Sequence, residues 1–375
     1  MINNKKLQEF YERVQEKSKR YIGYPSAVDF DYSELYPFLQ YSLNNVGDPT
    51  LPSSSDMNSH SFERDVLLFF AHLFKAPEKN WWGYITNGGS EGNMYALYLA
   101  RELYPEGMVY YSEATHYSIQ KNISLLNMHS IVIRTNSRGE MDYDDLKETL
   151  QMHRHQPAII LANVGTTMTE AKDNINQIQA ILKRYAIKNS YIHCDAALAG
   201  TYLSLLGESQ FDFSHGCDSI AISGHKFIGC PIPSGVILVK KHYRDRIGKS
   251  IPYIGTLDTT ISGSRNAITP LFLWYAIQKF GREGLLKRAE QSIEDAQFLT
   301  DALQQIGVDA WRNDHAITVV FPRPSQKICS KWSLATDGDI AHVICMPGVT
   351  KEMLQNFIAD MKKEAHAIEK EISNE

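Results

Sequence analysis

The sequence predicts an α/β protein whose main sheet is mostly parallel. Between residues 84 and 239, short apolar runs of strand length alternate with longer segments that repeat apolar residues at helical spacing. Several of the short runs, such as residues 158–163, are apolar almost throughout instead of alternating with polar residues. Strands of this kind are buried on both faces, because helices cover both sides of a parallel sheet.

The segments before residue 84 predict two helices separated by a long loop. Residues 4–20 are predicted to form a charged amphipathic helix, which ends at Gly23-Tyr24-Pro25 because glycine and proline disfavour helix. Residues 44–61 are rich in asparagine, proline and serine and predict a loop. Apolar residues at helical spacing then predict a helix over residues 62–74.

The alternating region defines the larger domain. The predicted strands are residues 84–86, 108–112, 130–134, 158–163, 191–194, 219–223 and 236–239, and the predicted helices are residues 90–103, 117–126, 142–153 and 175–185. We assign residues 56–262 to this domain and residues 1–55 to an N-terminal segment.

The pattern changes after Gly263 and predicts a smaller C-terminal α/β domain over residues 263–375. Its predicted elements are helices at 270–280 and 283–306, strands at 317–321 and 341–346, and an amphipathic helix at 350–369.

Composition limits the kind of protein. The chain has 375 residues, 43% of them hydrophobic and 22% charged, which is ordinary for a globular enzyme with a large core. A net charge of −5 disfavours nucleic acid as the main partner. The five cysteines are scattered and form no C-x-x-C pair, so we expect free thiols in a reducing compartment and no metal site. No signal peptide and no run of about 18 apolar residues is found, so a cytoplasmic location without membrane insertion is expected.

The first chemical signal is the Ser223-Gly224-His225-Lys226 sequence, which follows a predicted apolar strand. An ammonium group at the end of a buried strand is costly unless its amine is used. Burial lowers the pKa of a lysine and frees a nucleophilic amine, which suits a Schiff base with a carbonyl cofactor. The alternative is a surface lysine in a strand-to-loop turn.

The second signal is Asp195, which ends another apolar strand and is followed by Ala196 and Ala197. An enzyme that uses pyridoxal phosphate (PLP) needs a carboxylate that pairs with the ring nitrogen, so that the ring can accept electrons. Small residues after it would let the ring lie flat against the backbone. The alternative is a helix N-cap, a role that aspartate also favours.

The third signal is the turn Gly88-Gly89-Ser90 between a predicted strand and a predicted helix. Backbone N–H groups at a helix N-terminus bind anions. The turn matches neither the dinucleotide-binding G-x-G-x-x-G nor the P-loop, so a single phosphate monoester suits it better than a nucleotide. The alternative is a tight turn that uses glycine for its backbone freedom.

Two weaker signals follow other strands. His116 comes after the strand at 108–112, where an imidazole could stack on a cofactor ring and approach a substrate carboxylate. Thr166 and Thr167 follow the strand at 158–163 and could bond the ring oxygen of the cofactor. A lone histidine is more often structural, and threonines in loops usually have no special role.

The positions of these signals along the chain are more informative than each signal alone. Gly89, His116, Thr166, Asp195 and Lys226 each follow a different predicted strand. Ligands of parallel sheets bind at the carboxyl ends of the strands, where these residues would meet. The sequence therefore predicts a PLP site at this edge.

At this point the chain resembles the fold-type-I, group II PLP-dependent decarboxylases, in the branch of histidine and serine decarboxylases. The resemblance extends from Gly23 to Val349. It is carried by the segments Gly83-Tyr84-Ile85-Thr86-Asn87-Gly88-Gly89, Thr115-His116-Tyr117-Ser118, Ser223-Gly224-His225-Lys226 and Ser262-Gly263-Ser264-Arg265-Asn266. It implies a mostly parallel seven-stranded sheet in a large PLP-binding domain, a smaller C-terminal domain, and a homodimer with interfacial active sites.

The resemblance also implies a role for each matching residue. Lys226 corresponds to the Schiff-base lysine, Asp195 to the partner of the ring nitrogen, Ala197 to the residue under the ring and His116 to the histidine stacked above it. The implied phosphate contacts are Gly89, Ser90, Ser223 and His225, and the implied loop from the partner chain contains Ser262, Ser264 and Arg265.

Two positions depart from the family pattern. Many relatives have Gly-Ala where this chain has Glu170-Ala171, and Gly-His where it has Ala267-Ile268. Ile268 would lie near the partner-side pocket, so the departure bears on the substrate. Histidine is favoured slightly over serine, and an aliphatic amino acid such as valine is a further alternative. After decarboxylation of the substrate, the candidates for the acid that protonates the α-carbon are Tyr253, His116 and Lys226.

Other functions remain open at this stage. An aminotransferase or aldolase can share the fold, and a non-catalytic PLP-binding regulatory module would normally add a basic DNA-binding domain, of which the sequence shows no sign. A nucleotide-binding Rossmann protein is disfavoured by the missing G-x-G-x-x-G motif.

Overall fold

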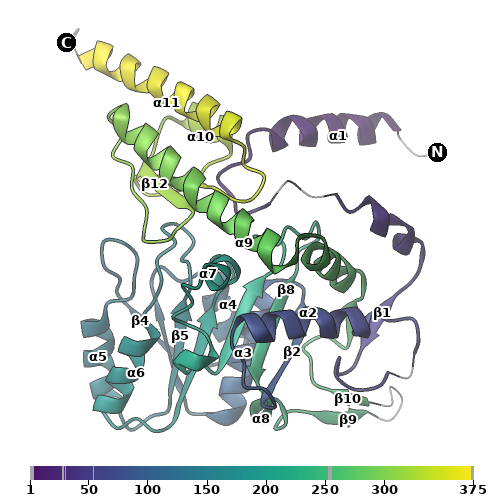
Figure 1. Cartoon of the computed structure of the whole chain (residues 1–375). Coiled ribbons are helices and arrows are strands. Elements are labelled where there is room, and N and C mark those ends of the chain that lie inside the picture. Colours follow the sequence, from purple (N-terminus) through teal and green to yellow (C-terminus); the bar gives the residue numbers. More distant parts are fainter. Residues whose placement is uncertain (1–3, 28, 30, 54, 252–255, 373–375) are drawn as a thin grey trace. The chain divides into compact units, whose positions relative to one another are not determined.

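The computed structural model describes residues 4–27, 29, 31–53, 55–251 and 256–372 (Figure 1). The contacts divide the chain into a larger unit, residues 30–289, and a smaller unit made of residues 1–29 and 290–375. This division falls within the long helix α9 (Ile268–Gln305), and the domain boundary at residue 263 stays a prediction. We describe each unit by itself.

The larger unit contains a seven-stranded sheet. Its strands, in spatial order, are β2 (Trp81–Thr86), β8 (Gly235–Lys240), β7 (Ser219–Ser223), β6 (Ser190–Asp195), β5 (Ala158–Asn163), β3 (Met108–Ser112) and β4 (His129–Ile133). Strand β8 runs antiparallel to β2 and β7, and all other neighbours pair in parallel. The predicted mostly parallel, seven-stranded α/β fold is therefore confirmed.

Helices cover this sheet. They are α2 (His60–Leu73), α3 (Gly89–Leu103), α4 (Ser118–Leu125), α5 (Tyr143–Met152), α6 (Ile175–Arg184), α7 (Gly200–Leu206) and α8 (Lys241–Arg244), with the 3₁₀ helix η1 at Ser33–Gln40. Helix α3 packs closely on the strands, since a Cβ on Gly92 would lie 3.0 Å from the Cβ of Ala221 in β7. Its apolar face adds Leu97 to one buried cluster and Tyr95 to another. The helix that follows β2 is thus fixed firmly against the middle of the sheet.

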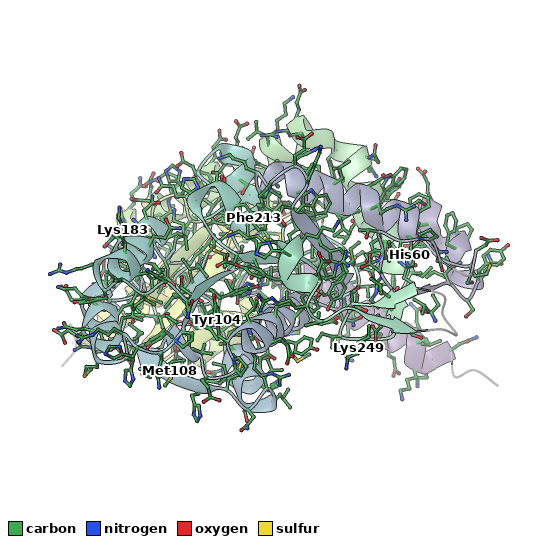
Figure 2. All side chains as sticks on the ribbon, turned by 90° about the horizontal axis from the view of Figure 1, so that it is seen from below. His60, Tyr104, Met108, Lys183, Phe213 and Lys249 are labelled. Carbon is green, nitrogen blue, oxygen red and sulfur yellow. The ribbon has the colours of Figure 1, made fainter. Side chains whose placement is uncertain are left out.

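Helix α6 illustrates how the sequence sets local ends. Asn174 caps it by accepting a hydrogen bond from the backbone N–H of Gln177 at 3.1 Å. Lys183 and Arg184 end it, and cations there interact favourably with the helix dipole. Lys183 is exposed, and Figure 2 shows its side chain at the periphery of the molecule.

Five short strands were not predicted: four lie in the larger unit, and the fifth, β13 (Ala335–Asp337), lies in the smaller one. Strand β1 (Asn44–Val46) lies in the predicted loop and pairs antiparallel with β11 (Ser264–Asn266), and β9 (Lys249–Ile251) pairs with β10 (Thr256–Asp258). Strands of three residues are too short to show a periodicity, so only their pairing in the folded chain reveals them.

The smaller unit has a three-stranded antiparallel sheet. Its order is β12 (Thr318–Pro322), β14 (Ile340–Ile344) and β13 (Ala335–Asp337), and its helices are α1 (Asn4–Ser18), α10 (Gln326–Trp332), α11 (Lys351–Ile372) and the last part of α9. Gly23 belongs to this unit, where a Cβ would lie 2.3 Å from the backbone oxygen of Ser333. Glycine therefore permits a close backbone approach here, besides ending the preceding helix.

Helix α9 corresponds to the two helices predicted on either side of residue 281. It is continuous from Ile268 to Gln305 except at Gly281, whose φ of 60° and ψ of 178° are not helical. In the part of the chain that the structure describes, no helix combines the length and the apolar character needed to span a bilayer.

Candidate active site

The residues predicted to carry chemistry follow strands that run in the same direction. Gly89 follows β2, His116 follows β3, Thr166 follows β5, Asp195 ends β6 and Lys226 follows β7. Strand β2 shares this direction because it and β7 are both antiparallel to β8. The structure therefore brings all five residues to one edge of the sheet, where the carboxyl ends of the strands meet.

The first turn of α3 forms a cradle at this edge. A Cβ on Gly89 would lie 2.9 Å from Ser223 Oγ and 3.2 Å from the Cβ of Ala197, so only glycine leaves this space open. Gly88, the N-cap residue, has a φ of 146° and no side chain that could cap the free N–H groups of the first turn. Ser90 is the next, exposed residue of the same turn. This arrangement suits a phosphate group, whose charge the helix N-terminus favours.

Asp195 is buried, with 7% of its surface exposed, and both of its carboxylate oxygens accept hydrogen bonds from the protein. Oδ2 accepts from Nδ2 of Asn93 at 2.7 Å, and Oδ1 accepts from the backbone N–H of Ala197 at 3.2 Å. The carboxylate is therefore held at a fixed orientation at the end of β6.

Lys226 is partly buried in the loop that follows β7. Desolvation lowers the pKa of this lysine, while the nearby carboxylates of Asp195 and Glu170 oppose that effect. A lowered pKa increases the fraction of neutral, nucleophilic amine. The geometry and the electrostatics therefore both suit a covalent link to a carbonyl group.

His116 is also half-buried, and its Nδ1 lies 2.8 Å from Ser118 Oγ. Since that contact occupies Nδ1, Nε2 is the nitrogen available to a bound molecule. Burial lowers the pKa of His116, Asp195 acts in the opposite direction, and Lys226 adds to the lowering. Asp195 and Lys226 are thus close enough to His116 to shift its pKa by electrostatic interaction.

His225 and the threonines have local bonds of their own. Nδ1 of His225 lies 2.9 Å from the backbone oxygen of Ser234, and burial lowers the pKa of His225. The hydroxyl of Thr166 accepts from the backbone N–H of Ala171 at 3.0 Å, so it stabilises its own turn, whereas Thr167 is exposed. A cofactor contact of either threonine stays a prediction.

Glu170 lies near Lys226, and nothing in the sequence indicated its role. It is 1% exposed, has a φ of 55°, and accepts a hydrogen bond from the hydroxyl of Tyr202. A left-handed backbone of this kind is one that glycine adopts without strain, so Glu170 occupies a position that suits glycine. The substitution noted in the sequence therefore places an additional carboxylate near Lys226.

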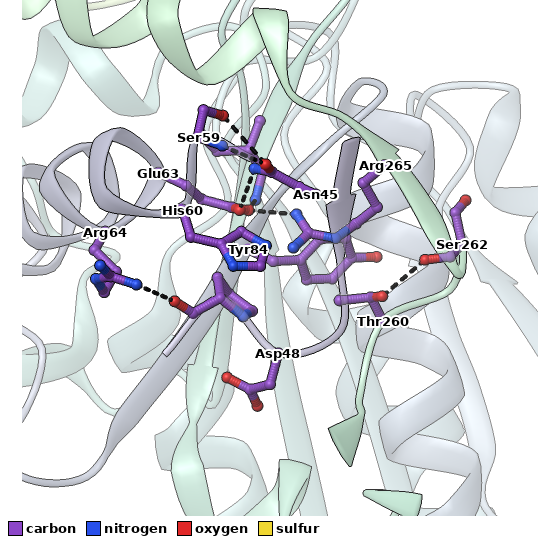
Figure 3. A network of polar contacts seen from close by, with 12 residues as sticks. Asn45, Asp48, Ser59, His60, Glu63, Arg64, Tyr84, Thr260, Ser262 and Arg265 are labelled. Carbon is purple, nitrogen blue, oxygen red and sulfur yellow. Dashed lines mark hydrogen bonds and ion pairs between the residues drawn. The ribbon is translucent and has the colours of Figure 1, made fainter. Parts of the chain in front are cut away.

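Arg265 is buried within its own chain (Figure 3). Its guanidinium forms an ion pair with Glu63, donates to the backbone oxygen of Gly47 at 3.2 Å and lies 5.4 Å from the ring centre of Tyr84. The loop expected to reach a partner chain thus directs this arginine inward. Ser264 accepts from Asn44 Nδ2 at 3.1 Å, and the backbone oxygen of Ser262 accepts from Thr260 at 2.9 Å.

Two further predicted residues are not placed at this edge by any hydrogen bond described above. Tyr253 lies outside the described residues. Ile268 is half-buried at the start of α9, where its backbone N–H donates to Asn266 Oδ1 at 2.8 Å. The same helix reaches the Lys226 loop five residues later, since a Cβ on Gly224 would lie 2.7 Å from Leu273 Cδ2.

Comparison with known proteins agrees with this geometry. Residues 58–321 match the conserved domain of pyridoxal-dependent decarboxylases. A histidine decarboxylase of Mesorhizobium japonicum is 47% identical over 95% of this chain and 96% of its own length. A histidine decarboxylase of Pseudomonas entomophila is 46% identical over 91% of this chain and 86% of its own length.

Solved structures show the same fold. The L-methionine decarboxylase of Streptomyces sp.590 superposes with a TM-score of 0.88 at 25% identity, covering 97% of this chain and 96% of its own. The glutamate decarboxylase of Lactobacillus brevis superposes with a TM-score of 0.81 at 17% identity, covering 98% of this chain and 93% of its own.

The fold and the site define a fold-type-I PLP-dependent enzyme. The chain belongs to the pyridoxal-dependent decarboxylase family, and it is a carboxy-lyase whose cofactor is PLP. The residues present fit this cofactor, because the Gly89 cradle, the bonded carboxylate of Asp195 and the amine of Lys226, whose pKa burial lowers, share one edge of the sheet.

Proposed function

We propose that this enzyme decarboxylates L-histidine to histamine and carbon dioxide. The observation that carries the proposal is the similarity to histidine decarboxylases from three bacterial genera, at 46–48% identity over 86–95% of the chain. Within one reaction class, similarity of this extent favours a shared substrate, which the assay below tests.

The proposed cofactor contacts follow from the geometry of the sheet edge. The first turn of α3, with Gly89 and Ser90, holds the phosphate together with Ser223 and His225. Lys226 supplies the amine that links the cofactor.

The ring of the cofactor has two further proposed contacts and a proposed hydrogen bond from the threonine turn. Ala197, beside the Gly89 cradle, and His116 would hold the ring between them. Thr166 or Thr167 bonds the ring oxygen, if the turn opens enough to release a hydroxyl.

The proposed chemistry depends on holding the substrate carboxylate out of the ring plane. When bound, PLP supplies an electron sink for the pair left by the broken Cα–carboxylate bond. Asp195 keeps the ring nitrogen protonated through its fixed carboxylate. Nε2 of His116 approaches the substrate carboxylate, because Nδ1 is occupied by Ser118.

A proton must then reach the α-carbon. His116 and Lys226 both stand at the required edge, and Tyr253 is the third candidate. General acids act best when their pKa lies near the working pH. Burial lowers the pKa of Lys226 toward neutral pH, whereas it lowers the pKa of His116 away from it, so these shifts favour Lys226 over His116 as the acid.

The substrate prediction is tested with the PLP-loaded protein and each of the twenty amino acids, with amine and carbon dioxide measured. We expect histidine to give the highest kcat/KM. A higher kcat/KM for serine, measured as ethanolamine, or for valine, measured as its aliphatic amine, would make that amino acid the substrate in place of histidine. An apolar contact such as Ile268 contributes only about 1–3 kcal/mol to discrimination, so some activity on other amino acids is compatible with the proposal.

The same assay separates the other functions that share the fold. An aminotransferase would release a keto acid and leave pyridoxamine phosphate, and a non-catalytic PLP-binding module would bind the cofactor without turnover. Failure to form any amine from the twenty substrates would contradict the proposed reaction.

We further propose a homodimer with interfacial active sites. Helix α1 has exposed apolar residues at helical spacing: Leu7, Phe10, Tyr11 and Val14 are 59%, 55%, 60% and 48% exposed. An apolar stripe of this kind marks an interaction surface. Light scattering coupled to size-exclusion chromatography is expected to give twice the chain mass, and Leu7→Ser with Phe10→Ser to shift it toward the monomer. A monomeric wild-type protein at micromolar concentration would contradict the dimer.

We also propose a cytoplasmic location. All five cysteines are buried and none forms a disulfide in the structure, as expected for a reducing compartment. Fractionation of cells that express the protein, followed by immunoblotting, tests this proposal, and recovery outside the cytoplasmic fraction would overturn it.

A further inference from the structure

A buried chain of hydrogen bonds leads away from Asp195 into the sheet. Asn93 Nδ2 donates to Asp195 Oδ2 at 2.7 Å, Asn93 Oδ1 lies 2.9 Å from Nε2 of His193, and Nδ1 of His193 lies 2.8 Å from Ser219 Oγ. Asn93, His193 and Ser219 are 2%, 0% and 0% exposed. This series of hydrogen bonds joins α3, β6 and β7. None of its three residues is among the proposed cofactor or substrate contacts.

The donor and the acceptor of each hydrogen bond in this series can be assigned by starting from Asp195. A carboxylate can only accept, so the amide of Asn93 must turn its NH₂ group toward Asp195. Its oxygen then faces His193, whose Nε2 must carry the proton. Nδ1 of His193 is consequently an acceptor, and the hydroxyl of Ser219 donates to it. All the donors point toward Asp195.

The electrostatics keep this arrangement in one protonation state. Burial lowers the pKa of His193 to about 4, against an opposing effect of the Asp195 carboxylate. The imidazole is therefore neutral at physiological pH and keeps a single tautomer. Successive hydrogen bonds that point the same way polarise one another in a low dielectric, so the chain presents its positive ends to Asp195.

Helix α3 connects this chain to the phosphate cradle. Asn93 follows Gly89 by four residues, which places both on one face of the helix, one turn apart. The same face thus contributes the cradle at its first turn and the donor to Asp195 at its second. A shift of the helix would disturb both contacts together.

We propose that Asn93, fixed by His193 and Ser219, is a positioning residue that orients the Asp195 carboxylate toward the ring nitrogen of PLP. The proposal rests on the assignment of Asp195 as the partner of that nitrogen. It extends the cofactor site by one layer of side chains that do not touch the cofactor.

The test compares Asn93→Leu with Ser219→Ala. Asn93→Leu removes the donor to Asp195 at similar volume, whereas Ser219→Ala removes a bond at the far end and leaves Asn93 next to Asp195. Supporting residues around a bound cofactor centre typically change affinity or activity about 10- to 100-fold. For Asn93→Leu we expect an increase of about that size in the Kd for PLP, a comparable fall in kcat with little change in KM, and an altered pH titration of the cofactor absorption and circular dichroism. Ser219→Ala removes only the bond at the far end, so we expect it to change kcat and Kd in the same direction as Asn93→Leu but by no more than about threefold.

A purely structural role predicts a different result. It would lower the melting temperature of Asn93→Leu while the folded, PLP-loaded protein kept the wild-type spectrum, Kd and kcat, and this outcome would overturn the proposal. Should Asn93→Leu not fold, Asn93→Asp keeps the shape of the side chain and places a second carboxylate beside Asp195. Wild-type PLP affinity and spectrum in folded Asn93→Asp would equally overturn it. Because Kd and spectrum need no substrate, they test Asn93 even if histidine proves not to be the substrate.

Discussion

Replacement of Lys226 by alanine is expected to abolish turnover, with a loss of kcat of about 10⁴–10⁶-fold, the range seen when a catalytic nucleophile is removed. The side chain supplies the amine for the covalent link, and the lowered pKa of Lys226 increases the neutral fraction of that amine. No other lysine is assigned to this edge of the sheet. The loss should therefore affect kcat far more than thermal stability.

Two measurements separate this effect from misfolding. The wild-type protein treated with PLP and borohydride should gain the mass of the reduced cofactor on the peptide that contains Lys226, and Lys226→Ala should not. Lys183→Ala is a matched control, because Lys183 is an exposed lysine at the end of α6. Turnover by folded Lys226→Ala at a rate close to that of the control would end the assignment of this lysine.

The order of the site residues could be predicted from sequence because it depends on chain direction. Each of Gly89, His116, Asp195 and Lys226 follows a strand that is apolar enough to recognise, and parallel strands end at the same edge. Once the strands are placed, the edge on which these residues meet follows without knowledge of side-chain contacts. The long helices and the break at Gly281 were predictable for the same local reasons.

The supporting residues could not be predicted in this way. Asn93 precedes Asp195 by 102 residues, and an asparagine within a helix has many uses. His193 was visible next to Asp195 in the sequence, but its role follows only from the 2.9 Å contact with Asn93. Glu170 was visible as a departure from the family, yet its left-handed φ and its bond with Tyr202 are properties of the folded chain.

Arg265 shows the limit of reasoning from a resemblance. Its motif suggested a loop reaching a partner chain, which stays a prediction, and within its own chain the Arg265 side chain is 3% exposed and paired with Glu63. The pairing joins residues 202 positions apart in the sequence, through the short strands β1 and β11 that no periodicity predicts. Whether the exposed residues of the loop contact a partner is a separate question from what Arg265 does.

The buried pair of Arg265 and Glu63 leads to a second large expected effect. Glu63 is 0% exposed, accepts from the backbone N–H of Ile85 at 2.9 Å and from Asn45 Nδ2 at 2.9 Å, and relies on Arg265 for its charge partner. Removal of one member of a buried ion pair leaves an uncompensated charge and typically costs about 3–5 kcal/mol. Arg265→Ala should lower the free energy of unfolding by that amount, as measured by urea denaturation of the apoprotein, where cofactor binding does not contribute.

Two comparisons make this prediction specific. Arg134→Ala removes an arginine that is 68% exposed and lies 3.4 Å from Asp145, and surface pairs of this kind contribute about 0–1 kcal/mol. Arg265→Leu combined with Glu63→Gln removes both charges, so it should recover part of the stability that Arg265→Ala loses, because no unpaired carboxylate remains. If Arg265 instead served the active site of a partner chain, Arg265→Ala would lose activity and keep its unfolding free energy. Comparison of the loss of activity with the loss of unfolding free energy therefore distinguishes a side chain that stabilises its own chain from one that acts across an interface.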